Sequence, residues 1–272
     1  MVPLARILLP VDLSDRSLVA ARQAQVLARH FHSEVTVLHV VDPQEQEFGR
    51  FEPGGVKGWE LESLLARDFT GASIRQIVCD GDPGGTILKL AGASHADLIM
   101  MASHGHGPFH SFLMGSVSAE VLREASCPVW ITAHGQPGPP PLFRNVLCAV
   151  DLGPRTESAI DWAAGFAAEF MAQLSVVHVL HGFDSRDATD APDDWLSAAD
   201  HSEIGWIRRK LGKESGIVFV GGSMPEAICS QAAKLRADLL VIGRSPKADD
   251  VGAARTASFM TIHESPCPVV CI

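Results

Sequence analysis

Clusters of positive charge and long apolar runs are both missing from this chain of 272 residues. The formal net charge is −10, whereas a general binder of nucleic acid or anionic membrane needs a concentrated Lys/Arg surface. No apolar segment approaches the roughly 20 residues of a membrane span. The amino-terminal apolar stretch is also too short for the core of a signal peptide. We therefore expect a soluble, cytoplasmic protein with no nucleic-acid or membrane partner.

Familiar catalytic signatures are absent too. The G-x-x-x-x-G-K-[ST] pattern of P-loop ATPases does not occur, and neither does the G-x-S-x-G turn that exposes a nucleophilic serine. We therefore expect no catalytic residues. The cysteines lie mostly inside or beside apolar runs, which is typical of buried thiols rather than of a disulfide framework. They are Cys79, Cys127, Cys148, Cys229, Cys267 and Cys271.

What the chain does contain is one pattern written twice. LLPVDLSD around Asp12 recurs as LCAVDLGP around Asp151, and VLHVVD around His39 recurs as VVHVLH around His178, each pair 139 residues apart. Such a repeat indicates two similar domains, and the Pro- and Gly-rich segment between the copies is typical of an extended linker. We predict an N-terminal domain over 1–134, a linker over 135–144 and a second domain over 145–272.

Within each copy, short β-branched runs alternate with longer segments of helical period, which indicates βαβ units on a parallel sheet. The predicted fold class is α/β, with two tandem doubly wound domains. Each is a five-stranded parallel sheet with helices on both faces, and ligands bind at the carboxyl ends of the strands. In the first copy we expect strands near 6–11, 34–41, 73–79, 97–102 and 128–133, and helices near 15–31, 58–68, 83–95 and 116–125.

Capping residues support this assignment. Ser14 is expected to cap the first helix, and Pro83 to lie in the first turn of the third. In the second copy, Pro154 is expected to open the first helix and residues 195–211 to form a longer second helix.

One loop of the first copy has the composition of an anion-binding segment. Residues 101–118, MASHGHGPFHSFLMGSVS, leave the fourth strand and enter a helix. Gly105, Gly107 and Gly115 permit positive φ and a close approach of the backbone, so that successive N–H groups can surround an anion. The loop therefore predicts a site for a negatively charged ligand.

Other groups at the same strand ends suit a nucleotide. The N-terminus of the helix that begins at Ser116 favours a phosphate, and the hydroxyls of Ser116 and Ser118 can donate as well. Asp12 follows the first strand and can accept hydrogen bonds from ribose hydroxyls, as an acidic residue does in other nucleotide-binding α/β folds. The same aspartate could instead be a structural cap for the first helix.

These residues resemble the nucleotide-binding motif of the universal stress proteins, G-x-x-G-x(9)-G-[ST] after the fourth strand with an aspartate after the first. Gly105, nine residues and then Gly115-Ser116 match it, while Ala102 replaces the first glycine. Through the repeats the resemblance spans nearly the whole chain, and it implies a tandem member with an adenine nucleotide alpha hydrolase-like fold. It also implies ATP or another adenine nucleotide, with or without Mg²⁺, and a stress sensor or regulator that at most hydrolyses ATP slowly.

The resemblance also implies individual roles. Asp12 would contact the ribose and the backbone of Val40 the adenine, while Ala102 adds a methyl group where the family's backbone lies near the ligand. The remaining cofactor-binding candidates are Pro10, Val11 and Met101, which would line the pocket, and Gly105, Gly115, Ser116, Val117 and Ser118, on the phosphate side.

The second copy departs from the motif. Gly243 is kept, but Thr256-Ala257 stands where the first copy has Gly-Ser, and Pro246 removes one N–H donor. We expect one competent site per chain, in the N-terminal half. The second domain would then serve as an intramolecular partner of the first. The sequence leaves open whether the chain also forms a homodimer.

Two other interpretations remain. The loop histidines, His104, His106 and His110, could hold zinc, but the loop contains no cysteine or acid to complete such a site, and we expect no metal. Alternatively, both sites are vestigial and the protein is a stress or interaction protein whose paired domains form a partner-binding surface. Ala102 and the degenerate second copy favour this alternative.

Overall fold

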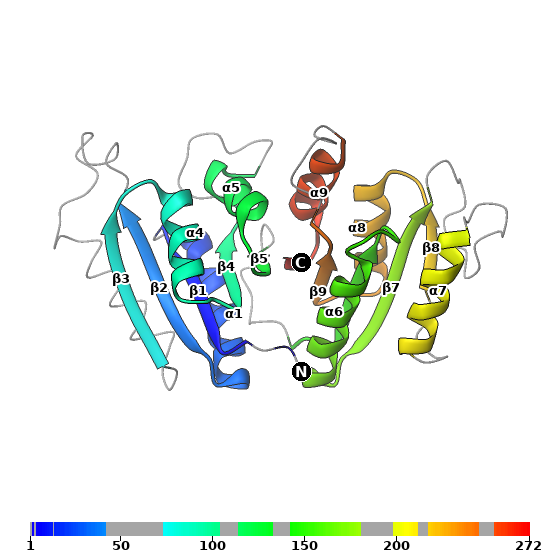
Figure 1. The fold of residues 1–272 in the computed structure, drawn as a ribbon, viewed down its shortest axis with the longest axis horizontal. Coiled ribbons are helices and arrows are strands. Elements are labelled where there is room, and N and C mark those ends of the chain that lie inside the picture. The colour runs from blue at the N-terminus through cyan, green and yellow to red at the C-terminus, as the bar shows by residue number, and fades with distance from the viewer. Residues whose placement is uncertain are drawn as a thin grey trace. The chain divides into compact units, whose positions relative to one another are not determined.

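The structure is a computed structural model that describes residues 2, 4–12, 14–41, 73–103, 114–132, 142–180, 198–211, 217–244 and 253–272. Figure 1 labels its helices and strands. The chain divides into two compact units, Pro3–Pro141 and Leu142–Ile272, the second of which also takes in Met1–Val2. The linker predicted over 135–144 lies mostly outside the described residues.

The N-terminal unit is a five-stranded parallel sheet in the order β3-β2-β1-β4-β5. The chain moves from β1 to β2 on one side and from β4 to β5 on the other, so the order reverses between β1 and β4. The helix predicted over 58–68 lies outside the described residues. The strands are β1 (Arg6–Pro10), β2 (Glu34–Val41), β3 (Ser73–Asp80), β4 (Leu98–Ala102) and β5 (Val129–Thr132), and the described helices are α1 (Asp15–Phe31), α4 (Pro83–Ala93) and α5 (Ser116–Glu124).

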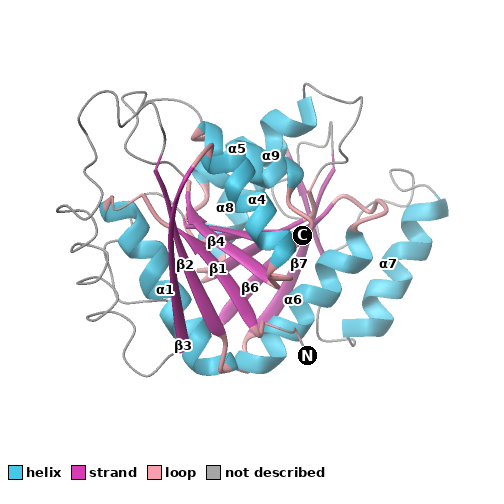
Figure 2. Cartoon of the chain, turned by 60° about the vertical axis from the view of Figure 1, so that its left-hand side comes forward, coloured by secondary structure: helices cyan, strands magenta, loops and turns pink. Residues whose placement is uncertain are grey.

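Helices cover both faces of this sheet, which explains its apolar strands. In β4, LIMMA, the first four residues are buried, and β5, VWIT, is buried throughout. Helix α1 packs on β1 and β4, whereas α4 and α5 pack against each other. Figure 2 shows α1 on the opposite side of the strands from α4. The predicted doubly wound arrangement is confirmed.

Local signals set the helix ends as the sequence predicted. The Ser14 hydroxyl accepts a hydrogen bond from the Ser17 amide and caps α1. Pro83 is the first residue of α4, where the Asp82 carboxylate accepts from the Gly85 amide at 2.7 Å. Both capping predictions are therefore confirmed.

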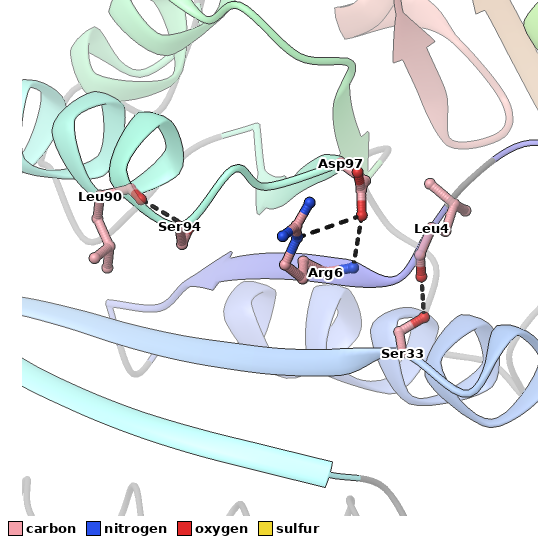
Figure 3. Close-up of polar contacts among 6 residues, drawn as sticks. All are labelled: Leu4, Arg6, Ser33, Leu90, Ser94 and Asp97. Carbon is pink, nitrogen blue, oxygen red and sulfur yellow. Dashed lines mark hydrogen bonds and ion pairs between the residues drawn. The ribbon is translucent and has the colours of Figure 1, made fainter.

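An aspartate joins β1 to β4 at the amino ends of the strands. Oδ2 of Asp97 accepts a hydrogen bond from the Arg6 amide at 2.8 Å and lies 3.9 Å from Nε of Arg6 (Figure 3). Asp238 repeats the contact in the C-terminal unit, where its Oδ2 accepts from the amides of Arg144 at 2.7 Å and Asn145 at 2.9 Å. The repeat seen in the sequence thus extends to individual hydrogen bonds.

The C-terminal unit has the same topology, with a parallel sheet in the order β10-β9-β6-β7-β8. Its strands are β6 (Asn145–Val150), β7 (Gln173–Leu180), β8 (Ile217–Gly221), β9 (Leu239–Ile242) and β10 (Val269–Cys271). Its described helices are α6 (Thr156–Phe170), α7 (Ala198–Leu211), α8 (Met224–Lys234) and α9 (Ala253–Glu264).

In this unit the start of α6 differs from the prediction. Helix α6 begins at Thr156, because the Thr156 amide donates to the Gly153 carbonyl at 3.0 Å and closes a turn. Pro154 occupies the second position of that turn, which proline favours, and so precedes the helix instead of opening it. Helix α7 begins at Ala198, while residues 195–197 lie outside the described part.

The cysteines are free thiols, as the sequence predicted. Cys148, Cys267 and Cys271 are buried, and the other three are partly buried. Burial raises the pKa of Cys148, Cys229, Cys267 and Cys271 to about 12. In the part of the chain that the structure describes, no helix is both long and apolar enough to cross a membrane.

Candidate functional site

The predicted site lies at the carboxyl ends of β1 and β4, where the strand order reverses. Leu8 pairs with Ile99, and the same register carried forward puts Pro10 level with Met101. The segments that follow these strands lead to Asp12 on one side and to α5 on the other. In doubly wound sheets, ligands bind outside the strand ends at such a reversal.

Asp12 is held in place by the hydroxyl groups of α1. Its Oδ1 accepts hydrogen bonds from the Ser14 amide at 3.1 Å, from Oγ of Ser14 at 2.6 Å and from Oγ of Ser17. Oγ of Ser17 also accepts from the Asp12 amide at 3.1 Å. Ser17 is buried, so these contacts orient the carboxylate before any ligand binds. They also tie Asp12 to the start of α1, which is the structural role left open by the sequence.

His39 fixes the backbone directly before Asp12. Its Nδ1 lies 2.9 Å from the Val11 carbonyl, and because a carbonyl only accepts, Nδ1 is the donor. His178 makes the same contact with the Val150 carbonyl at 2.8 Å. The side chain of His39 is 6% exposed, which is consistent with packing at the strand end.

Two hydrogen bonds join the end of β4 to the start of α5. The Gly115 amide donates to the Ser103 carbonyl at 3.0 Å, and Oγ of Ser118 donates to the Ala102 carbonyl at 3.0 Å. Ser103 and Ser118 are both buried. The first turn of α5 is therefore anchored to the carbonyls of Ala102, the last residue of β4, and Ser103, the next residue.

That first turn presents three adjacent amides, those of Ser116, Val117 and Ser118, which have no acceptor among the described residues. The first N–H groups of a helix have no partner within the helix, and Gly115 at the cap position offers no side chain to accept from them. Ser116 is exposed and Val117 partly exposed, so solvent reaches this helix end. Three amides at the positive end of a helix favour a phosphate.

Gly115 does not use the positive φ that glycine permits. Its φ of −56° and ψ of 147° are open to any residue. What glycine supplies here is the absence of a side chain beside the three amides. Several other predicted residues of this loop lie outside the described part of the chain: Gly105, Gly107, His104, His106 and His110.

The remaining candidates lie at the same strand ends. Pro10, Val11 and Met101 are buried, while Val40 and Ala102 are partly exposed. Within the described ranges, no three side chains of His, Cys, Asp or Glu come together to hold a metal.

The C-terminal unit keeps the aspartate but has a different helix start. Oδ1 of Asp151 accepts from the Gly153 amide at 2.9 Å and from Oγ1 of Thr156 at 3.5 Å. Helix α9 begins at Ala253, three residues before Thr256, which is the counterpart of Gly115. The amides that correspond to the open ones of α5 therefore lie inside α9, where an α-helix directs them to carbonyls four residues earlier.

Sequence reasoning missed Ser17, which contacts both the amide and the carboxylate of Asp12. The repeat held the signal, because the counterpart of Ser17 is Thr156, another buried hydroxyl residue that contacts the counterpart aspartate. A hydroxyl kept at the same position in both copies, five residues after each aspartate, could have identified it.

Two doubly wound units, with an aspartate after the first strand of each, define a tandem α/β protein. The model of the Universal stress protein family matches residues 4–133 and again residues 142–272. The chain therefore belongs to the universal stress protein family and carries two of its domains.

Individual relatives agree with this result. A universal stress protein of Mycobacterium tuberculosis is 24% identical over 283 residues, which covers 96% of this chain and 94% of that protein. One from Methanocaldococcus jannaschii is 31% identical over 140 residues, covering 46% of this chain and 80% of that protein. The crystal structure of a universal stress protein from Archaeoglobus fulgidus shares the fold, with a TM-score of 0.69 at 22% identity, covering 98% of this chain and 95% of that one.

Proposed function

We propose that the N-terminal unit binds ATP or another adenine nucleotide and that the protein acts as a stress-response sensor or regulator. The open first turn of α5 carries this proposal. Its three amides lack an acceptor in the described part of the chain, at the strand ends where Asp12 also lies. A bound phosphate would accept from these amides and would gain from the positive end of the helix. Membership of the family supports the role in stress.

In this proposal each part of a nucleotide has a partner. The Asp12 carboxylate, already oriented by Ser14 and Ser17, accepts from the ribose hydroxyls. The backbone of Val40 meets the adenine, and the amides of Ser116 and Val117 hold phosphate oxygens. Mg²⁺, when present, reduces the charge on the phosphates. No catalytic residue is assigned, so any hydrolysis of ATP is expected to be slow.

Replacing Gly115 with valine tests the phosphate site. The backbone angles at Gly115 suit a β-branched residue, so the variant should fold, while its side chain crowds the three amides. We expect ATP affinity to fall at least ~10-fold, because the lost contacts include charge-assisted hydrogen bonds. Isothermal titration calorimetry with ATP, with and without Mg²⁺, measures the affinity and should give one site per chain in the unchanged protein.

Thr256→Val is the matched control, because it makes the same kind of change at the counterpart position of the other unit. It should leave ATP binding unchanged. Loss of binding in Thr256→Val, with binding intact in Gly115→Val, would assign the site to the C-terminal unit instead. The nucleotide proposal fails if the unchanged protein carries no nucleotide by mass spectrometry and shows no heat of binding with millimolar ATP.

A second candidate function is partner binding without a nucleotide. Two observations favour it: Ala102 replaces the first glycine of the motif, and one oxygen of Asp12 already accepts three hydrogen bonds at the start of α1. In that case the open amides are bound by water and the surfaces of the two domains carry the function. Absence of bound nucleotide and of any ATP-dependent rise in melting temperature would favour this candidate.

A further inference from the structure

Ser118 links α5 to the sheet in a way that the family motif does not describe. Its side chain is 4% exposed, and its hydroxyl donates to the Ala102 carbonyl at 3.0 Å. Ala102 is the last residue of β4 and pairs with Thr132 of β5, so this carbonyl belongs to a rigid part of the sheet. Because the hydroxyl proton is directed at Ala102, it is not available to a phosphate.

The bond fixes where α5 begins. Gly115 contacts the Ser103 carbonyl through its amide, and Ser118, three residues later, contacts the preceding carbonyl through its side chain. Two attachments, one on each side of the open amides, define both the position and the direction of the first turn. A change at Ser118 should therefore alter how the amides of Ser116 and Val117 point.

The C-terminal unit shows the alternative arrangement within the same chain. The counterpart of Ser118 is Phe259, which has no hydroxyl, and the counterpart of Ala102 is Gly243. Helix α5 begins at Ser116, shortly before Ser118. Helix α9 begins at Ala253, about one turn earlier relative to its Phe259. The C-terminal unit therefore lacks the hydroxyl, and its counterparts of the open α5 amides lie inside α9.

We infer that Ser118 is a positioning residue, which sets the phosphate-binding amides of α5 by bonding to the Ala102 carbonyl and does not itself touch the ligand. This inference rests on the proposed function and deepens it. It assigns Ser118 to the support of the site, although the sequence suggested a direct phosphate contact.

The test compares Ser118→Ala with Ser118→Thr and Ser94→Ala. The Ser94 hydroxyl also donates to a backbone carbonyl, that of Leu90 at 2.8 Å, but this bond lies within the end of α4, as Figure 3 shows. We expect Ser118→Ala to weaken ATP binding about 2- to 12-fold, the range for loss of one buried hydrogen bond. Ser118→Thr keeps the hydroxyl and should restore most of the affinity. Ser94→Ala should lower the melting temperature and leave affinity unchanged.

Amide hydrogen exchange, measured without nucleotide, distinguishes a positioning residue from one that only stabilises the fold. In Ser118→Ala, exchange of the Gly115 and Ala119 amides, which donate to the carbonyls of Ser103 and Gly115, should quicken while the rest of the N-terminal unit keeps its protection. If this variant does not fold, Ser118→Cys keeps the volume with a weaker donor, and its affinity should fall between those of Ser118→Ala and the unchanged protein.

The outcomes separate the two claims. If the unchanged protein binds ATP and Ser118→Ala binds it with the same affinity, the positioning role is overturned. The nucleotide proposal then remains intact. An equal loss of affinity in Ser94→Ala also overturns it, because general destabilisation then accounts for the result. If the unchanged protein does not bind ATP, the proposed function fails, and this inference fails with it.

Discussion

Among the described helices, α1 and α6 have as their C-cap a left-handed residue that is not glycine. His32 ends α1 with φ of 55°, and Met171 ends α6 with φ of 51°. Left-handed backbone costs an L-residue roughly 1 kcal/mol, which is why glycine usually occupies such positions. Met171 is 95% exposed, so its side chain gains little packing that could offset this cost.

Met171→Gly should therefore raise the free energy of unfolding. We expect a gain of about 0.5–1 kcal/mol, measured by urea denaturation followed by circular dichroism. Ala164→Gly, in the interior of α6, is the control and should lower stability by about 1 kcal/mol, because glycine is a poor helix former. A loss of stability in both variants would show that the left-handed cap carries no strain.

At single residues, the sequence predicted the groups that act locally. Ser14 was recognisable as a helix cap, because it stands directly before a segment of helical period. The bond from Ser118 to the Ala102 carbonyl was not predictable, because sixteen residues separate the two and only the folded sheet brings them together. The backbone angles of Gly115 were not predictable either, because glycine permits positive φ without requiring it.

Among the elements, α6 owes its place to a cluster of aromatic rings. Phe166 is fully buried and stacks on Trp162, with ring centroids 5.1 Å apart at 12°. It also meets Phe143 edge to face at 5.2 Å and lies 4.8 Å from Phe170. The indole N–H of Trp162 is buried and has no acceptor within the described part of the chain. The cluster therefore depends on ring packing and not on the indole hydrogen bond.

Phe166→Ala should destabilise the protein by about 3–5 kcal/mol, because it leaves a cavity at the centre of the cluster. Trp162→Phe keeps a stacked ring and removes a buried donor that lacks an acceptor, so the free energy of unfolding should change by less than about 1 kcal/mol. Urea unfolding of both variants makes the comparison. A cost in Trp162→Phe as large as that of Phe166→Ala would mean that the indole nitrogen does have an acceptor.

In the N-terminal unit the sequence predicted the described elements to within two residues, because burial on both faces and helical period are strong signals. Two helix starts needed the structure. Pro154 suits a first helical turn and the second position of a β-turn equally, and only the contact between Thr156 and Gly153 decides between them. The early start of α9 was hidden, because alignment of the copies places Thr256 at the cap position.

Across the whole molecule, the thiols whose pKa is raised are distributed unevenly. The four thiols whose pKa rises to about 12, Cys148, Cys229, Cys267 and Cys271, all belong to the C-terminal unit. Burial is the first cause in each case. The chain has no tyrosine, so no phenol titrates in the same alkaline range. Alkaline pH should therefore act on stability in part through these thiols.

A buried thiol stabilises the folded state below the pKa of about 9 that it has when unfolded, and this contribution is lost as the pH rises toward 12. For Cys148, we expect a loss of about 2 kcal/mol between pH 8 and pH 10.5. Cys148→Val should reduce the pH dependence of urea unfolding by that amount. Leu147→Ala, which changes a buried neighbour that does not ionise, should lower stability equally at both pH values. An unchanged pH dependence in Cys148→Val would show that this thiol ionises as easily in the folded protein as in the unfolded chain.

The early start of α9 has a consequence for the history of the two copies. Adding a turn to the start of a helix leaves the strands beneath it as they were, yet it removes the donors that an anion would need. A duplicated domain can thus lose an anion site through one local change and keep its fold. Under the proposed function, selection for ligand binding then falls on the N-terminal copy alone, and the other copy is free to acquire a different surface while the two remain covalently joined.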